Sequence, residues 1–176
     1  GSDVCSSDLH VRGVTVSSNG TLVGGLMGQF NGSTNEAIRN SYATGSVTGS
    51  DNVGGLIGVF GPASAGVSPM LFNSYATGAV ALSSGATGTH LGAVGGAIRG
   101  ALSALFFDSS TTGQSDSNAT AKTTAQMQGT AASGNLQSTD LGTAFRLVTG
   151  DYPLLCKYGA PANCPSDSDL VSGQLN

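Results

Sequence analysis

The sequence predicts an all-β protein, a β-solenoid built from repeats of about 30–35 residues with a small irregular C-terminal cap. The octads VGGLMGQF at Val23–Phe30 and VGGLIGVF at Val53–Phe60 lie 30 residues apart, and the hexamer NSYATG follows each, at Asn40 and Asn73. Glycine accounts for 28 of 176 residues, and charged residues for 9%, against roughly 25% in an average soluble domain. Small uncharged residues with recurring Val, Leu and Ile suit a narrow coil of stacked strands.

The repeats divide the chain into four segments. Residues 1–9 resemble the in-frame translation of a sequencing adapter, and we expect them to be a scar outside the fold. Residues 10–115 are predicted to form the solenoid, and residues 116–164 to cap it. Residues 165–176 are expected to be a flexible tail or linker. Because the repeats begin inside a copy, we expect the chain to be part of a longer protein.

Each copy is expected to contain two strands. One covers the VGGL residues, and the other leads into NSYATG, at Ile38–Val47 and Leu71–Val80. Glycines between them supply backbone conformations that other residues adopt only at a cost. The insertions Gly61–Pro69 and Ser83–His90 are longer than their counterparts, which is typical of loops on a repeat scaffold. These two loops are the predicted contact surface.

A degraded third copy follows at VGGAIRGA, from Val94, and DSSTTG, from Asp108. Matching positions of successive coils lie about 4.8 Å apart in stacked strands. The spacing therefore predicts three ladders of side chains: Val23, Val53 and Val94; Asn40, Asn73 and Asp108; and Tyr42 with Tyr75. A ladder of amides satisfies its own hydrogen bonds, so recurring asparagines need no catalytic role.

The apolar run Leu91–Phe107 has three interpretations: a soluble strand, a membrane span or a buried helix. A membrane span needs about 20 residues, whereas this run is shorter, contains Arg99 near its middle and includes four glycines. Its alignment with the octad favours the soluble strand, with no membrane insertion by this segment.

The C-terminal region offers weaker signals. Thr123–Gln128 is predicted to start a short helix with a threonine cap, and Tyr152–Leu155 to form an edge strand because it contains proline. Cys156 and Cys164 flank a segment with glycine and proline, so a turn would allow a disulfide in an oxidising compartment. Two free thiols are the alternative.

The two intact copies resemble the GLUG motif, named for its Gly-Leu-x-Gly core, here at Gly25–Gly28 and Gly55–Gly58. The segment Phe106–Leu155 is similar to the region that often follows the last repeat in such proteins. This family comprises bacterial surface or secreted proteins, including filamentous-haemagglutinin-like adhesins and peptidases with repeats outside the catalytic domain. The resemblance implies a right-handed β-helix-like stalk in an extracellular or cell-surface location. It implies binding to a host or matrix surface through a glycan or protein ligand.

Few residues suggest chemistry, so we expect no enzyme, cofactor or metal. His10 and His90 stand alone in the sequence, and Glu36 is the only glutamate, so the paired carboxylates of a glycosidase are missing. Six scattered Lys and Arg residues and a net charge of −4 argue against nucleic acid.

The expected function is therefore a non-catalytic structural or adhesive stalk that displays loops. One alternative is a non-catalytic repeat module of a large secreted enzyme, such as a peptidase or a polysaccharide-active enzyme. Another is a binder of ice or a crystalline surface, which needs a flat array such as Thr44, Thr77 and Thr112.

Overall fold

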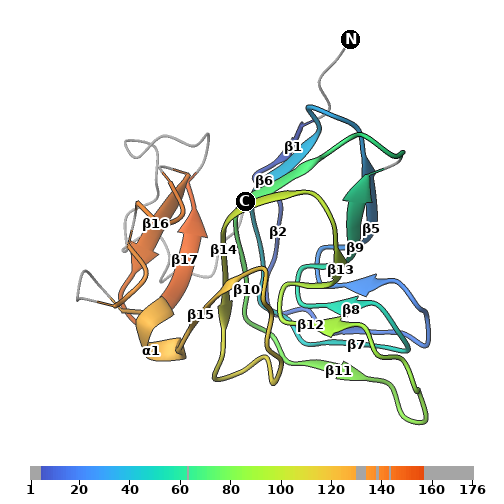
Figure 1. Ribbon diagram of the computed structural model, residues 1–176. Coiled ribbons are helices and arrows are strands. Elements are labelled where there is room, and N and C mark those ends of the chain that lie inside the picture. The colour runs from blue at the N-terminus through green and yellow to red at the C-terminus, as the bar shows by residue number, and fades with distance from the viewer. Residues whose placement is uncertain (1–4, 63, 130–133, 138, 143, 157–176) are drawn as a thin grey trace, which may run out of the picture.

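The protein is a β-solenoid of about three turns (Figure 1). The structure is a computed structural model that describes residues 5–156 except 63, 130–133, 138 and 143. Strands from successive turns pair in parallel, and in the described residues the only helix is one short turn. The predicted fold class is confirmed.

Each turn contributes strands to four parallel sheets, which we call sheets A to D. Sheet A contains β1 (Cys5–Ser7), β2 (His10–Val11), β6 (Ala37–Ala43), β10 (Met70–Ala76), β14 (Ala101–Asp108) and β15 (Thr120–Lys122). Sheet B contains β3 (Val16–Ser17), β7 (Val47–Gly49) and β11 (Val80–Leu82). Sheet C contains β4 (Val23–Gly24), β8 (Val53–Gly54) and β12 (Leu91–Gly92). Sheet D contains β5 (Met27–Gly32), β9 (Ile57–Pro62) and β13 (Gly95–Ile98).

The interior of the coil is filled by apolar side chains that recur at one register position in each turn. Phe30 stacks on Phe60 with ring centroids 5.3 Å apart and nearly parallel planes. Phe60 is fully buried, as are Ile38 and Leu71, which pair across β6 and β10. Burial of these rows, together with backbone pairing, holds the turns together.

In the third turn, the alignment of residues with the first two turns differs from the one predicted by sequence identity. Val23 pairs with Val53, but Val53 pairs with Leu91, so the predicted place of Val94 in this ladder is wrong. Val94 instead continues the row of Leu26 and Leu56, and its carbonyl accepts the Leu56 amide at 2.9 Å. The third octad is therefore LGAVGGAI, from Leu91 to Ile98. It differs in sequence from the first two because an inward position needs an apolar side chain of suitable size and not one particular residue.

The hexamer of the third turn is also shifted. Ser74 pairs with Leu105, which places Ala104 beside Asn73, so the prediction that Asp108 continues the asparagine ladder is wrong. Asn40, Asn73 and Ala104 share a left-handed backbone, with φ of 48°, 49° and 49°. The amide of Asn73 donates to Oδ1 of Asn40 at 3.4 Å. Phe106 pairs with Tyr75, so the aromatic ladder predicted for Tyr42 and Tyr75 extends into the third turn.

The exclusion of residues 5–9 from the fold is also wrong. β1 pairs in parallel with Ala37–Arg39 of β6, and the Leu9 carbonyl accepts the Tyr42 amide at 3.0 Å. Asp8 has a φ of 59°, which matches the kink at Asn40. Strand pairing uses backbone groups, so a segment without the repeat's side chains can still occupy an edge.

The C-terminal segment lies beside the coil. It consists of α1 (Thr124–Met127), with the predicted threonine cap at Thr123, and the antiparallel strands β16 (Phe145–Val148) and β17 (Asp151–Leu155). Figure 1 shows it on one side, next to β10 and β14. It covers the outer face of sheet A, so most of the predicted cap does not lie over an end of the coil.

The last turn is closed by two side chains from the segment between β14 and β15. Asp116 Oδ2 accepts the backbone N–H groups of Val94 at 3.0 Å and Gly95 at 3.2 Å. Gln114 donates to the Val80 carbonyl at 3.1 Å. These groups take the place of the backbone that a further turn would supply, which protects an edge from pairing with other chains.

The apolar run Leu91–Phe107 forms β12, β13 and most of β14, as the soluble-strand interpretation predicts. In the described part of the chain, the helix is too short to cross a membrane.

Candidate functional site

The first predicted contact loop lies at the corner between sheets D and A, which the three turns cross with different lengths. Gly32 pairs with Pro62 and Ala37 with Met70, so residues 33–36 of the first turn match residues 63–69 of the second. In the third turn Ile98 pairs with Phe60 and Ala101 with Met70, so only Arg99 and Gly100 cross. Gly100 has a φ of 145°, which favours glycine.

The second predicted contact loop, Ser83–His90, is anchored at its end by Asp51. One carboxylate oxygen, Oδ1, accepts the backbone N–H groups of Thr89 and His90, both at 3.1 Å. The His90 ring nitrogen Nδ1 lies 3.1 Å from the same oxygen. The His90 amide, the His90 side chain and the neighbouring Asn52 amide lower the pKa of Asp51. The residues between Ser83 and Thr89 make one turn and are mostly exposed.

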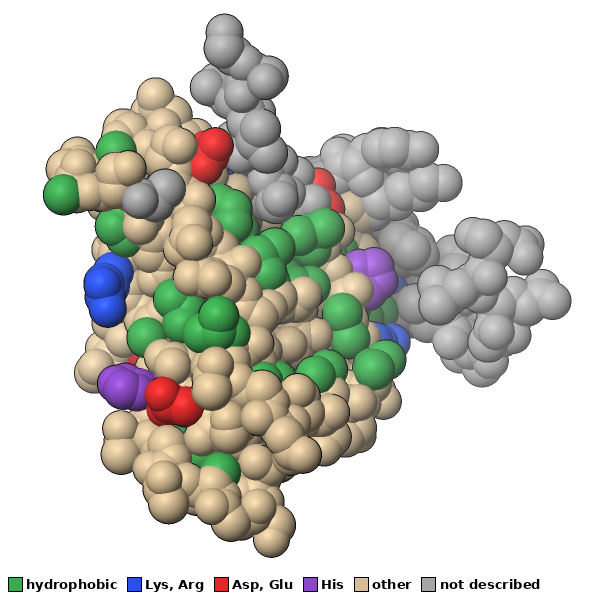
Figure 2. Space-filling model, turned by 90° about the vertical axis from the view of Figure 1, so that its right-hand side faces the viewer, with side chains coloured by type: hydrophobic (Ala, Val, Ile, Leu, Met, Phe, Trp, Pro, Cys, Tyr) green, Lys and Arg blue, Asp and Glu red, His purple; other side chains and the backbone are tan. Residues whose placement is uncertain are grey.

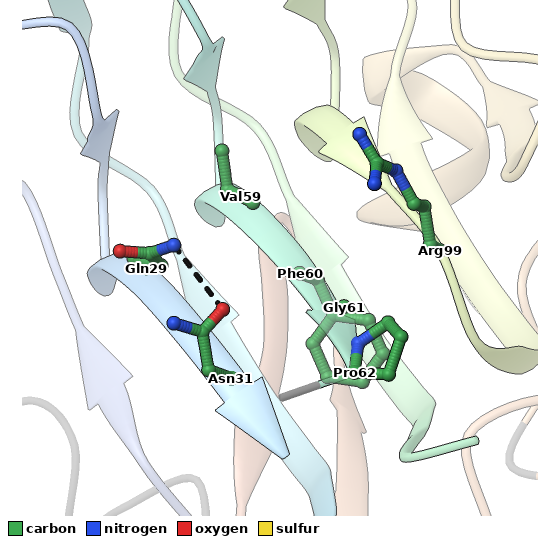
Figure 3. Close-up of a pocket in the computed structure, with 7 residues that line it drawn as sticks. All are labelled: Gln29, Asn31, Val59, Phe60, Gly61, Pro62 and Arg99. Atoms are coloured by element: carbon green, nitrogen blue, oxygen red, sulfur yellow. Dashed lines mark hydrogen bonds between the residues drawn. The ribbon is translucent and has the colours of Figure 1, made fainter. Parts of the chain in front are cut away.

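A shallow hollow lies on the outer face of sheet D, with a volume of about 200 Å³. Figure 3 shows its lining, contributed by all three turns: Gln29, Asn31, Val59, Phe60, Gly61, Pro62 and Arg99. The amide of Gln29 donates to Oδ1 of Asn31 at 3.1 Å. Arg99 is exposed, and its guanidinium makes no hydrogen bond or ion pair with any described residue. The predicted contact loop Gly61–Pro69 begins too early, because Gly61 and Pro62 belong to β9.

The hollow exists because the middle turn has no side chain where its neighbours have long ones. Asn31 pairs with Gly61, and Arg99 follows Ile98, the partner of Phe60, so the three lie in one outward row. Sequence reasoning did not find this site. The sequence did contain one indication of it. The three copies keep an apolar residue at the inward position, but at the next, outward position they carry Asn31, Gly61 and Arg99.

An aromatic row joins the coil to the C-terminal segment. His10 stacks on Tyr42 at 5.2 Å and Tyr42 on Tyr75 at 4.9 Å between ring centroids. Phe145 packs against both tyrosines, and the Tyr75 hydroxyl donates to the Pro153 carbonyl. Burial raises the pKa of Tyr42 and raises that of Tyr75 well above its usual value.

One ion pair closes the edge of this joint. Arg12 donates to Asp151 of β17, and both side chains are partly exposed. Burial lowers the pKa of Arg12, but the hydrogen bond to Asp151 and the charge of Asp151 raise it by more, so the pKa of Arg12 lies above its ordinary value. Since the pair is partly solvated, we expect it to orient the two segments more than to stabilise them.

Asp108 lies buried inside the same joint. Its Oδ2 accepts the hydroxyls of Thr124 and Tyr152, each at 2.6 Å, and its Oδ1 accepts the Ser110 amide at 2.8 Å. Burial, followed by the hydrogen bond to Asp108, raises the pKa of Tyr152. Asp108 is 0% exposed, so its carboxylate attaches the C-terminal segment and cannot reach a substrate.

The threonines proposed for surface binding do not form an exposed array. Thr77 is 3% exposed and Thr112 is 1% exposed. Ala76 pairs with Phe107, so the residue of the third turn that aligns with Thr77 is Asp108 and not Thr112. In the part of the chain that the structure describes, no group of three or more His, Cys, Asp or Glu residues lies close enough to hold a metal.

Cys156 is disulfide-bonded, and its sulfur is held at the end of β17. Cys164 lies outside the described residues, so its pairing with Cys156 stays a prediction.

Figure 2 shows the side of the molecule that bears the loops, where Lys and Arg side chains are few and lie apart from one another. Asp51 and His90 place one carboxylate beside one imidazole at the end of the second loop, and Arg99 is the only Lys or Arg among the described residues of the two loops and the hollow, so these residues form no basic track for nucleic acid. No protein family model, no curated protein and no solved structure matches this chain.

Proposed function

We propose that this chain is a non-catalytic stalk segment of a bacterial extracellular or cell-surface protein of the GLUG-motif kind, which displays loops for adhesion to a host or matrix surface. The observation that supports it most directly is the pair of corners that change length from turn to turn while the strands keep their register. Such a scaffold holds loops of different size on a rigid base.

The position of the loops supports this function. Residues 64–69 and Ser83–His90 lie on the side of the coil away from β16 and β17 (Figure 1). A partner can therefore approach them without displacing the C-terminal segment. The disulfide at Cys156 supports an extracellular location, because disulfides persist in oxidising compartments.

The test is adhesion of inert beads coated with the purified chain to host cells and matrix proteins. The structure supplies a loop-shortened variant: residues 33–36 replace residues 63–69, and Ser50–Asn52 replace Ser83–His90. Both grafts keep the flanking strands in register, since Gly49 pairs with Leu82 and Val53 with Leu91.

We expect the loop-shortened variant to lose most of the adhesion while its far-ultraviolet circular dichroism stays unchanged. The matched control is Ala81→Ser, at an exposed position of β11 outside both loops, which should adhere like the wild type. Equal adhesion of the wild type and the loop-shortened variant would contradict the proposal. It would favour a spacer module of a larger secreted enzyme.

A further inference from the structure

The hollow on sheet D has the features of a small ligand site. Phe60, Gly61 and Pro62 of β9 line its middle, and the Phe60 side chain itself is 0% exposed and belongs to the buried core. Polar side chains stand on either side of the gap at Gly61, with Gln29 and Asn31 on β5 and Arg99 after β13 (Figure 3). The strands that carry it, β5, β9 and β13, lie on the opposite side of the coil from β16 and β17 (Figure 1).

Arg99 determines the charge of the ligand. A guanidinium has five donors and no acceptor, and it matches a carboxylate with two parallel hydrogen bonds. Among the described residues no carboxylate approaches Arg99, so this cation has no partner within the described chain. Arg12, by contrast, already pairs with Asp151.

The two amides determine the rest of the ligand. The hydrogen bond from Gln29 to Asn31 holds both side chains in place. It leaves Oε1 of Gln29 as an acceptor and Nδ2 of Asn31 as a donor. A hydroxyl donates and accepts, so neighbouring hydroxyls of a sugar can engage both amides.

The size fits one sugar unit. Asn31 and Arg99 lie on strands two spacings apart, which is about 10 Å. The volume of about 200 Å³ is smaller than that of a pocket for a drug-sized ligand. From this geometry we propose that the hollow binds one carboxylated sugar unit of an acidic polysaccharide, with the carboxylate on Arg99 and hydroxyls on Gln29 and Asn31.

This inference goes beyond the proposed function, because the residues that line the hollow lie outside the two segments that the loop-shortened variant replaces. A single exposed unit binds weakly, so adhesion through this site would need several units of one polymer or several copies of the protein.

The test is titration of the ¹⁵N-labelled full chain with trigalacturonate and with its methyl ester, followed by nuclear magnetic resonance. The ester keeps the hydroxyls and removes the charge. We expect trigalacturonate to shift the Gly61 amide, the Arg99 side chain and the Gln29 and Asn31 amides, and to bind at least about tenfold more tightly than the ester.

Three variants locate the site. Arg99→Gln should weaken trigalacturonate binding by about tenfold or more. Gly61→Val should abolish it by filling the gap, and it should fold, because a Cβ at Gly61 meets its nearest atom, Arg99 Cβ, at 3.6 Å. The matched control Arg39→Gln removes an exposed cation from β6 and should leave binding unchanged.

Equal affinity for the acid and the ester would overturn the proposal, as would equal weakening by Arg39→Gln. Equal binding of an acetylated tripeptide with a free C-terminal carboxylate would overturn the sugar assignment in favour of a peptide. No shift at Gly61 with millimolar trigalacturonate would also overturn it. If beads still adhere in that case, only this inference fails; if the sugar binds but beads do not adhere, the display function fails and the site stands.

Discussion

Tyr75 is the residue on which the attachment of the C-terminal segment depends most. Its side chain is 0% exposed, stacks on Tyr42 and packs against Phe145, and its hydroxyl donates to Pro153. Replacing a buried aromatic side chain by alanine costs about 3–5 kcal/mol, which includes the lost stacking. Since the whole stability of a domain is about 5–15 kcal/mol, Tyr75→Ala should remove a large share of it.

The conservative variant separates packing from hydrogen bonding. Tyr75→Phe keeps the ring and removes the donor to the Pro153 carbonyl, so it should cost only about 1–2 kcal/mol. Both values come from urea unfolding followed by far-ultraviolet circular dichroism. Val14→Ala, at a position that is 53% exposed, is the control and should change stability by less than about 0.5 kcal/mol.

Limited proteolysis shows whether the loss is local. If Tyr75→Ala releases the C-terminal segment from an intact coil, cleavage should concentrate in residues 124–156. A cost below about 1 kcal/mol for Tyr75→Ala, with unchanged proteolysis, would refute the reasoning. It would mean that the aromatic row does not hold β16 and β17.

Three further predictions concern the coil and its joint. Gly54→Ala should unfold the protein or lower its stability by about 3 kcal/mol or more in thermal melts, because its Cβ would lie 2.0 Å from the Ile57 carbonyl oxygen. Gly61→Ala, whose Cβ would make an ordinary contact with Arg99 Cβ at 3.6 Å, should melt like the wild type. Above pH 10, unfolded tyrosines ionise while buried Tyr75 keeps its proton, so stability should fall by up to about 1.4 kcal/mol per pH unit for each such tyrosine. The urea midpoint between pH 9 and pH 11 measures this, Tyr75→Phe should show a shallower fall, and a flat profile would contradict the assignment. Ala104→Asn should stabilise the protein by about 1 kcal/mol in urea, since alanine is strained at a φ of 49°; destabilisation would show that the site has no room for the amide.

The intact repeats made most of the coil predictable. Val23 and Val53 carry the same letters at the same register, so their pairing followed from the sequence. The third turn was misaligned with the first two because the sequence from Val94 is more similar to the octad than the sequence from Leu91, where the octad begins in the structure. Val94 is the same residue type as Val53, but the backbone pairing shows that the partner of Val53 is Leu91.

The hollow and the joint could not be predicted for a different reason. Gln29 and Arg99 are far apart in the sequence, and their place on one face depends on the length of every intervening corner. Asp108 looked like a third asparagine, whereas a shift of the hexamer moved it into contact with Tyr152. Both the frame of the hexamer and the position of the hollow depend on corners that differ in length from turn to turn, and the sequence does not mark where each corner begins and ends.

The constancy of strand register across corners of unequal length has an evolutionary consequence. Tandem duplication of one coding unit lengthens the molecule by about 4.8 Å and introduces no surface that has not already been matched to its neighbour. Length can thus change in discrete steps by recombination, independently of substitutions in the loops.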